Sequence, residues 1–369
     1  MPAALLLSAN LSITFAHFAE IEFLMNIQIQ KPGRILSGDK TAITEAYAAW
    51  MKQPVDQDFL DDEPEPVITG ERTIAKPVEV TGPGTFFGKS ERTLKIEPCE
   101  KGWWFDRTDL PDCLATEVSV RNVWTLGAIV SNIVLRSGPP DNYIRMIEHM
   151  VALKLGLGID SLLFRLDSGD PPLFERGSVD LVEAIEDAGV RQLNRPVRYV
   201  TVKEPVTVGS EAGGFLTFIP CNNRLPLLTV DSAVDFNDAI GQQRIRFPVT
   251  PTHFRYGAAA RTNTTAAKRF YAQTIGKIFA DVRNLGYTDK NILVAGRRRY
   301  HNKPRLIHQG KSLEAAWHRA ALDLLAGLAL IDSGRFVGHV ISYKAGHRLD
   351  VHMITKLYLD DLLIEWTAV

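Results

Sequence analysis

The sequence has few cysteines and no excess of charge of either sign. Its three cysteines, Cys99, Cys113 and Cys221, are too few and too scattered for a disulfide framework or a cysteine zinc site, which favours a reducing compartment. Lysine and arginine total 42 and aspartate and glutamate total 43, which gives a net charge of −1. No overall field therefore attracts nucleic acid or an anionic membrane.

The motifs of several well-known enzyme classes are also missing. The stretch VTGPGTFFGKSER contains glycines and GKS, but their spacing is not that of a phosphate-binding loop. The chain has neither a GxSxG nucleophile elbow nor an HExxH metal helix. The chain therefore carries none of these three signatures.

No lysine or arginine precedes Lys31. A secretory signal needs a basic region and a small-residue cleavage site, and the uncharged run ends at His17 and Glu20, too early to span a bilayer. These residues read as a peripheral extension, or as sequence upstream of a true start at Met25. The alternative is a weak, peripheral contact with a membrane surface.

The chain as a whole has the composition of a soluble globular protein. It is 45% hydrophobic and 23% charged, and 369 residues suffice for two domains. The acidic stretch DQDFLDDEPEPV reads as a linker because it has little to bury. We predict an N-terminal extension and acidic linker over 1–70, domain I over 71–222 and domain II over 223–369, with the junction at the turn CNNRLP.

Two segments of the chain resemble each other. Residues 148–167 and 318–340 each read as an apolar helix ending near glycine, followed by a short link and an alternating strand. Two such units indicate two domains built on one plan. The neighbouring strands RIRFPVT and NILVAG favour an α+β fold of layers over regular βαβ winding.

Two histidines stand beside groups that suit hydrolytic chemistry. His149 follows Glu148 on an apolar helix, where it could bind a metal while Glu148 acts as general base, or could simply be packed in the core. His347 follows a strand and a glycine in YKAGHRLD, with Lys344 nearby as a cation for a phosphate or an oxyanion. The alternative for that segment is a solvated loop.

The helix EAAWHRAALDLLAGL places His318 and Asp323 five residues apart. Five residues rotate an α-helix by roughly 500°, which leaves the two side chains about 140° apart. An ordinary α-helix therefore cannot aim both at one ion. A π-bulge between them would restore a common face, provided that Arg319 finds a partner.

A run of arginines, Arg297 to Arg299, lies in AGRRRYHNKPR. It could grip a diphosphate or an acidic partner, or form a solvated, mobile loop.

Several of these motifs, in this order, resemble one family. They are ERTIAKPVEVTGPGTFFGK, FDRTDLP, RMIEHMVALKLGLGID, FERGSVDLVEAIEDAGV, AARTNT, HRAALDLLAGL and YKAGH. The chain is identified from them as a divergent member of the UDP-3-O-acyl-N-acetylglucosamine deacetylases, the zinc amidases of lipid A synthesis. The resemblance covers about residues 71 to 369.

The resemblance implies two similar domains packed face to face with the active site between them. It also implies a zinc ion (Zn2+) whose bound water attacks the acetamide of a UDP-linked acylated amino sugar in the cytoplasm. By motif, the metal ligands are His149, His318 and Asp323, and the catalytic residues are Glu148 and His347. Substrate-binding roles fall to Lys344 and Arg261.

This sequence departs from the family pattern at several polar positions. The family's second helix has its histidine and aspartate four residues apart, and an acid where this chain has Gly327. A family threonine is Ala233 here, the aspartate of an aspartate-glycine-serine turn is Arg176, and a histidine is replaced near Phe86. These changes imply a damaged metal site. They raise an alternative function, a catalytically inactive or altered homologue that binds a nucleotide sugar or regulates a partner.

Overall fold

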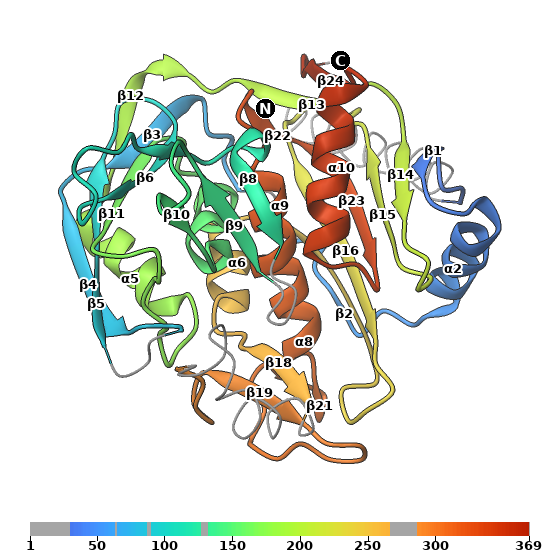
Figure 1. Ribbon diagram of the computed structural model, residues 1–369. Coiled ribbons are helices and arrows are strands. Elements are labelled where there is room, and N and C mark those ends of the chain that lie inside the picture. The colour runs from blue at the N-terminus through green and yellow to red at the C-terminus, as the bar shows by residue number, and fades with distance from the viewer. Residues whose placement is uncertain (1–29, 63–64, 87–89, 127–131, 266–285, 369) are drawn as a thin grey trace, which may run out of the picture.

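The computed structural model describes residues 30–62, 65–86, 90–126, 132–265 and 286–368. Two large β-sheets face each other, and most of the helices fill the space between them (Figure 1). The main hydrophobic core lies in this helical layer and against the inner faces of both sheets. The α+β fold with two face-to-face layers, predicted from the sequence, is confirmed.

The first sheet belongs to domain I. Its strands, in order across the sheet, are β4 (Val78–Pro83), β5 (Glu91–Pro98), β11 (Leu162–Leu166), β6 (Trp103–Arg107) and β7 (Thr116–Glu117). Every second residue of β6 and β11 is buried, as expected for strands with one face on the core. Helices α3 (Glu148–Val151), α4 (Leu153–Gly156) and α5 (Val179–Ala188) belong to the same half of the chain.

The second sheet belongs to domain II and has seven strands among the described residues. Their order is β1 (Arg34–Ser37), β14 (Val206–Gly209), β15 (Phe215–Ile219), β23 (Gly338–Tyr343), β16 (Leu228–Asp235), β17 (Gln242–Pro248) and β2 (Gln57–Asp58). The central strands β15 and β23 are buried along their whole length because helices cover both faces.

Smaller sheets complete the described strands. They are β10 (Tyr143–Ile144), β9 (Ile133–Arg136) and β8 (Val123–Leu126); β22 (Arg335–Phe336), β13 (Tyr199–Val202) and β24 (Leu363–Glu365); β12 (Val190–Pro196) and β3 (Gly70–Ile74); β18 (Thr262–Thr265) and β19 (Ile292–Ala295); and β20 (Ile307–His308) and β21 (Lys311–Ser312).

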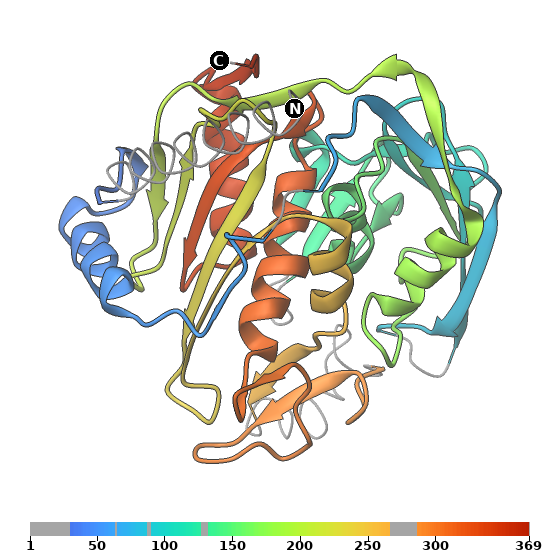
Figure 2. The ribbon, with the colours of Figure 1, turned by 180° about the vertical axis from the view of Figure 1, so that it is seen from behind.

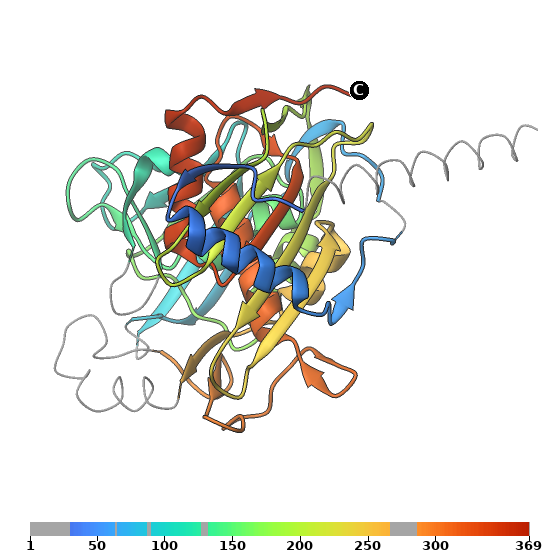
Figure 3. The same cartoon turned by 90° about the vertical axis from the view of Figure 1, so that its right-hand side faces the viewer.

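Residues 34–58 are part of domain II and not a loose extension. Helix α2 (Lys40–Lys52), capped by Asp39, lies across the outer face of the seven-stranded sheet (Figure 3). Tyr47 and Trp50 pack there against Phe215 of β15. The prediction for residues 1–70 was therefore wrong for 34–58, because α2 buries apolar side chains that a linker would expose, and β1 and β2 pair with β14 and β17 of the sheet. The predictions for the first 29 residues lie outside the described part.

The predicted domain junction at 222/223 also needs correction. Strands β14 and β15, assigned to domain I by that boundary, are hydrogen-bonded into the sheet of domain II through β23. The turn CNNRLP connects two strands of one sheet, and turn residues alone do not distinguish such a connection from a junction between domains. Strand pairing favours a boundary before β14.

The helix that carries His318 and Asp323 is irregular. Helix α8 (Glu314–Trp317) continues into a π-helical turn, His318–Leu324, and then into α9 (Leu325–Ala329). Figure 2 shows this rod running beside α6 (Pro251–Gly257), where a Cβ on Gly257 would come within 2.7 Å of the Ala321 Cβ. Helix α10 (His347–Leu359) packs on the other side.

None of the described helices combines the length and the apolar character that crossing a bilayer requires.

Candidate active site

Glu148 lies at the start of α3, where the chain leaves the edge of the β8–β9–β10 sheet. The side chain is 3% exposed, and its Oε1 accepts a hydrogen bond from the Ile133 amide. Burial raises the pKa of Glu148, and the nearby His347 opposes that shift only in part. Its Oε2 has no hydrogen-bond partner among the described residues. A buried carboxyl group of this kind suits a general base.

His149 is oriented by Ser178, which immediately precedes α5. The Ser178 hydroxyl donates to the His149 carbonyl and lies 3.1 Å from Nδ1. Because that hydroxyl donates its own hydrogen to the carbonyl, its oxygen accepts a hydrogen bond from Nδ1–H, which leaves a lone pair on Nε2. Burial lowers the pKa of His149 to about 3, so the imidazole is neutral. A neutral, oriented imidazole is the form that binds a metal. Ser178 is not among the site residues predicted from the sequence, although it lies in the motif FERGSVDLVEAIEDAGV.

The π-helical turn brings His318 and Asp323 together. Nδ1 of His318 lies 3.5 Å from Oδ2 of Asp323, and the His318 ring is 5.5 Å from the His149 ring between centroids. A π-helix bonds residue i to residue i+5, so residues five apart share a face. The π-bulge proposed from the spacing is present, and the misalignment of an ordinary helix does not arise.

His347, the first residue of α10, completes the group. Its Nε2 lies 3.5 Å from Oδ1 of Asp323 and 3.6 Å from Oε1 of Glu148. Burial lowers the pKa of His347, but Asp323, Glu148 and Asp350 outweigh that effect and raise it. This imidazole therefore favours its protonated form, which suits a general acid or a donor to an oxyanion.

The donor set of His149, His318 and Asp323 fits zinc in its chemistry. Burial disfavours ionisation of Asp323, but His318 and His347 outweigh it and lower the pKa of this carboxyl below its usual range. Two imidazoles and a carboxylate with an open fourth position match a catalytic zinc site. Across the described residues, however, no three such side chains are already arranged to hold a metal. The donors instead contact each other and their neighbours.

Thr262 is a second residue that the sequence interpretation did not single out. Its hydroxyl lies 3.0 Å from Nε2 of His318, at the start of β18. The stretch AARTNT contained this residue, but a lone threonine carries no signal without its spatial neighbours. Thr262 is placed to orient His318 or to donate to a group bound beside it.

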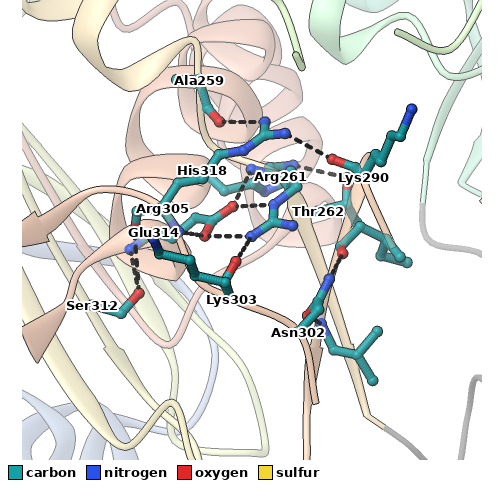
Figure 4. Close-up of polar contacts among 12 residues, drawn as sticks. Ala259, Arg261, Thr262, Lys290, Asn302, Lys303, Arg305, Ser312, Glu314 and His318 are labelled. Carbon is teal, nitrogen blue, oxygen red and sulfur yellow. Dashed lines mark hydrogen bonds and ion pairs between the residues drawn. The ribbon is translucent and has the colours of Figure 1, made fainter. Parts of the chain in front are cut away.

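Arg261, predicted to bind substrate, is buried next to Thr262. Its guanidinium bonds Glu314 through Nε at 2.6 Å, and it also donates to the Asp289 and Lys303 carbonyls (Figure 4). The side chain is 3% exposed. These contacts favour an indirect role for Arg261, which fixes the start of β18 and thereby Thr262. Direct contact with substrate stays a prediction that this packing does not favour.

The other predicted cations lie outside the buried group. Lys344 is exposed in the turn before α10, and Arg297 to Arg299 are exposed in the turn after β19.

Tyr287 is a further buried residue close to Glu148. Burial raises the pKa of Tyr287, and the charge of the Glu148 carboxylate raises it further. The Tyr287 hydroxyl is buried without a hydrogen-bond partner in the described part of the chain.

Two departures from the family pattern do not damage this site. Ala233 lies under α2 on the outer face of the sheet, so its replacement removes no donor from the group. Arg176 bonds Asp180 and Glu183 at the exposed start of α5. The expectation that these changes weaken one site together is therefore wrong for both residues.

Another acid takes the place of the one that the family has at position 327. Asp350, on α10, lies 4.0 Å from Nδ1 of His347. His352, another histidine of α10, bonds Ser37 at 2.7 Å and is not among the converging residues.

Comparisons with known proteins find similar sequences over most of the chain. A family model described as LpxC, UDP-3-O-acyl N-acetylglycosamine deacetylase, matches residues 71–359. A protein named UDP-3-O-acyl-N-acetylglucosamine deacetylase from Solibacter usitatus (strain Ellin6076) is 27% identical over 300 residues, 80% of this chain and 93% of the relative. Proteins of the same name from Vibrio parahaemolyticus and Hahella chejuensis are 26% and 27% identical over 81% and 78% of this chain, and 93% and 90% of the relatives.

Proposed function

Because the chain belongs to the UDP-3-O-acyl N-acetylglycosamine deacetylase family, we propose that it hydrolyses the acetamide of a UDP-linked, acylated N-acetylglucosamine. His149, His318 and Asp323 would hold Zn2+, which supplies a Lewis acid for the carbonyl and lowers the pKa of a bound water. The observation that carries the proposal is the π-helical turn, which places Asp323 within 3.5 Å of both His318 and His347.

Glu148 would act as the general base. Its carboxyl is buried, has one oxygen without a partner among the described residues, and has a pKa raised by burial. A base with a raised pKa accepts a proton near neutral pH more effectively than an exposed glutamate. Glu148 takes a proton from water as the water oxygen bonds to the carbonyl carbon.

His347 would act as the general acid and donate a proton. Its protonated form is favoured by Asp323 and Glu148, each within 3.6 Å. It stabilises the developing oxyanion and then protonates the amine nitrogen as the C–N bond breaks. The products are acetate and the free amine of the sugar. The hydroxyl of Thr262 is placed to assist at the oxyanion through its position beside His318.

The nucleotide part of the substrate would lie near Lys344. This lysine is exposed three residues before His347, and a diphosphate there would gain a charge-assisted contact. A UDP-linked substrate belongs to the cytoplasm, and we place the reaction there.

The proposal is tested first by elemental analysis of the purified protein and of its His149→Ala variant. We expect about one zinc per chain in the parent protein and far less in the variant. The control is His352→Ala, which removes a histidine that bonds Ser37 outside the site and should keep the metal.

Turnover is then measured on the acetylated UDP-sugar. Glu148→Gln should retain zinc and lose about 10²- to 10⁴-fold in kcat, as expected for removal of a general base. Absence of zinc and of turnover in the parent protein, with retained binding of UDP, would instead support the non-catalytic, nucleotide-sugar-binding alternative.

A further inference from the structure

Arg319 follows His318 in the π-helical turn, and its guanidinium bonds a residue of α10. It forms a two-pronged ion pair with Asp350, with one contact of 2.6 Å, and Nε donates to the Ser342 hydroxyl at 3.1 Å. Arg319 is 4% exposed and Asp350 is 1% exposed. The pair is thus fully buried between the π-helical turn and α10.

Gly327 makes room for this pair. It lies on α9 beside α10, and a Cβ at this position would come within 2.7 Å of the Asp350 Cβ. Since that neighbouring atom lies next to the backbone, it cannot swing away as a flexible side-chain tip would. The absence of a side chain at 327 and the presence of a carboxylate at 350 therefore belong together.

Each member of the pair stands next to a residue of the site. Arg319 adjoins His318 in sequence, and Asp350 lies one turn after His347, with 4.0 Å between Asp350 Oδ2 and His347 Nδ1. A buried ion pair with fixed two-pronged geometry can set register between two elements. Here it joins the irregular turn to the first turn of α10.

We propose that Arg319 and Asp350 are positioning residues, and that their buried ion pair holds the π-helical turn in register so that His318, Asp323 and His347 face one another. The inference deepens the proposed function, and its metal-binding part depends on it. Without the pair, the extra residue would be free to move along the helix, and His318 would turn away from Asp323.

The test replaces both charges at once, with Arg319→Met and Asp350→Leu in one chain. Removing both partners avoids leaving one charge buried and unpaired, so the variant should fold. Zinc affinity, measured by competition with a chelating dye, should weaken about 10- to 100-fold, the range typical for loss of groups that orient metal ligands. Amide hydrogen exchange over residues 318–324 should also become faster.

The matched control is another buried two-pronged pair, Arg244 and Asp231, on the far face of the sheet of domain II. Arg244→Met with Asp231→Leu removes the same chemistry there and should leave zinc affinity and exchange in 318–324 unchanged. A second variant lacks Arg319 and carries Asp350→Leu. It places His318 and Asp323 four residues apart, and zinc affinity should return.

The outcomes separate this inference from the proposed function. If the parent protein binds no zinc, the proposed function fails, and hydrogen exchange alone decides the positioning role. Faster exchange in Arg319→Met with Asp350→Leu supports the role. Exchange and zinc affinity equal to those of the parent protein would overturn it, as would an equal weakening in the Arg244 and Asp231 control.

Discussion

At the scale of single residues, the site depends on which atom of each side chain already has a polar contact with a neighbouring residue. Ser178 occupies Nδ1 of His149, Thr262 occupies Nε2 of His318, and Asp323 lies between His318 and His347. These contacts fix ring orientations before any ligand arrives, which reduces the conformational freedom lost on binding.

Lys344 provides a test of substrate recognition at this scale. We expect Lys344→Met to raise KM for the UDP-linked substrate about tenfold, the effect of losing ~1.4 kcal/mol from one charge-assisted contact. The kcat value should change little, since the lysine lies outside the buried group. Steady-state kinetics measures both. Lys76→Met, an exposed lysine between β3 and β4, is the control, and an equal effect in both variants would refute the role.

His339 predicts a pH dependence of stability away from the site. It is 4% exposed, its Nδ1 lies 2.8 Å from the Thr229 hydroxyl, and burial lowers its pKa to about 4. An unfolded histidine titrates near pH 6.5. The unfolded chain therefore binds the proton first, and stability is lost as the pH falls from about 6.5 to about 4.

We expect His339→Leu to reduce this loss in the free energy of unfolding by at most about 3 kcal/mol across that pH range. Urea unfolding at several pH values measures the free energy of unfolding in both proteins. His301→Leu, at an exposed histidine, should keep the pH profile of the parent protein. Parallel profiles for His339→Leu and the parent protein would show that His339 does not contribute.

At the scale of elements, α2 is an integral part of domain II. Trp50 is 1% exposed, its ring lies under the Arg244 guanidinium at 4.3 Å, and it contacts Phe215. The Arg244 guanidinium in turn donates to the Trp50 and Gln53 carbonyls at the end of the helix. The helix and the sheet therefore stabilise each other by apolar burial and by hydrogen bonds.

Truncation of Trp50 tests this packing. Trp50→Ala should lower the free energy of unfolding by about 3 to 5 kcal/mol, as expected for a large aromatic side chain removed from a core. The neighbour Met51 is 48% exposed, and Met51→Ala should change stability by about 0.5 kcal/mol or less. Urea unfolding compares the two. Similar small effects would mean that α2 is only loosely attached.

At the scale of the whole molecule, the site exists only where the two halves meet. Glu148 and His149 come from domain I, whereas His318, Asp323 and His347 come from domain II. The half-buried Lys154 of α4 donates to the Ala329 and Ile331 carbonyls, both at 2.9 Å, which joins the halves at the end of α9. A positive charge at a helix C-terminus is stabilising there.

The arginine turn at 297–299 lies on the outer surface of the molecule. Its residues are exposed, and a diphosphate would gain electrostatic attraction there. Changing all three arginines to glutamine should weaken UDP binding about three- to tenfold at low salt, with a smaller effect at high salt because exposed charges are screened. Titration calorimetry measures the affinity. Equal affinity of the parent protein and the variant at low salt would show that the turn is solvated surface without a binding role.

Much of the architecture was determined by the sequence itself. The apolar periodicity of 148–167 and 318–340 predicted the helix-to-strand units, and the order of motifs predicted the family and the face-to-face layers. Local periodicity suffices for this because a helix or strand must bury its apolar face whatever its partner is. The five-residue spacing of His318 and Asp323 also indicated that an ordinary helix could not serve.

Only the tertiary structure decided how that spacing is resolved. Whether a helix accepts an extra residue depends on partners far away in sequence, here Asp350 for Arg319 and Gly327 beside Asp350. Likewise, no local pattern separates Ala233, beneath α2, from a residue of the site. Side-chain direction and long-range pairing are set by packing between elements, and a sequence pattern contains only the spacing within each element.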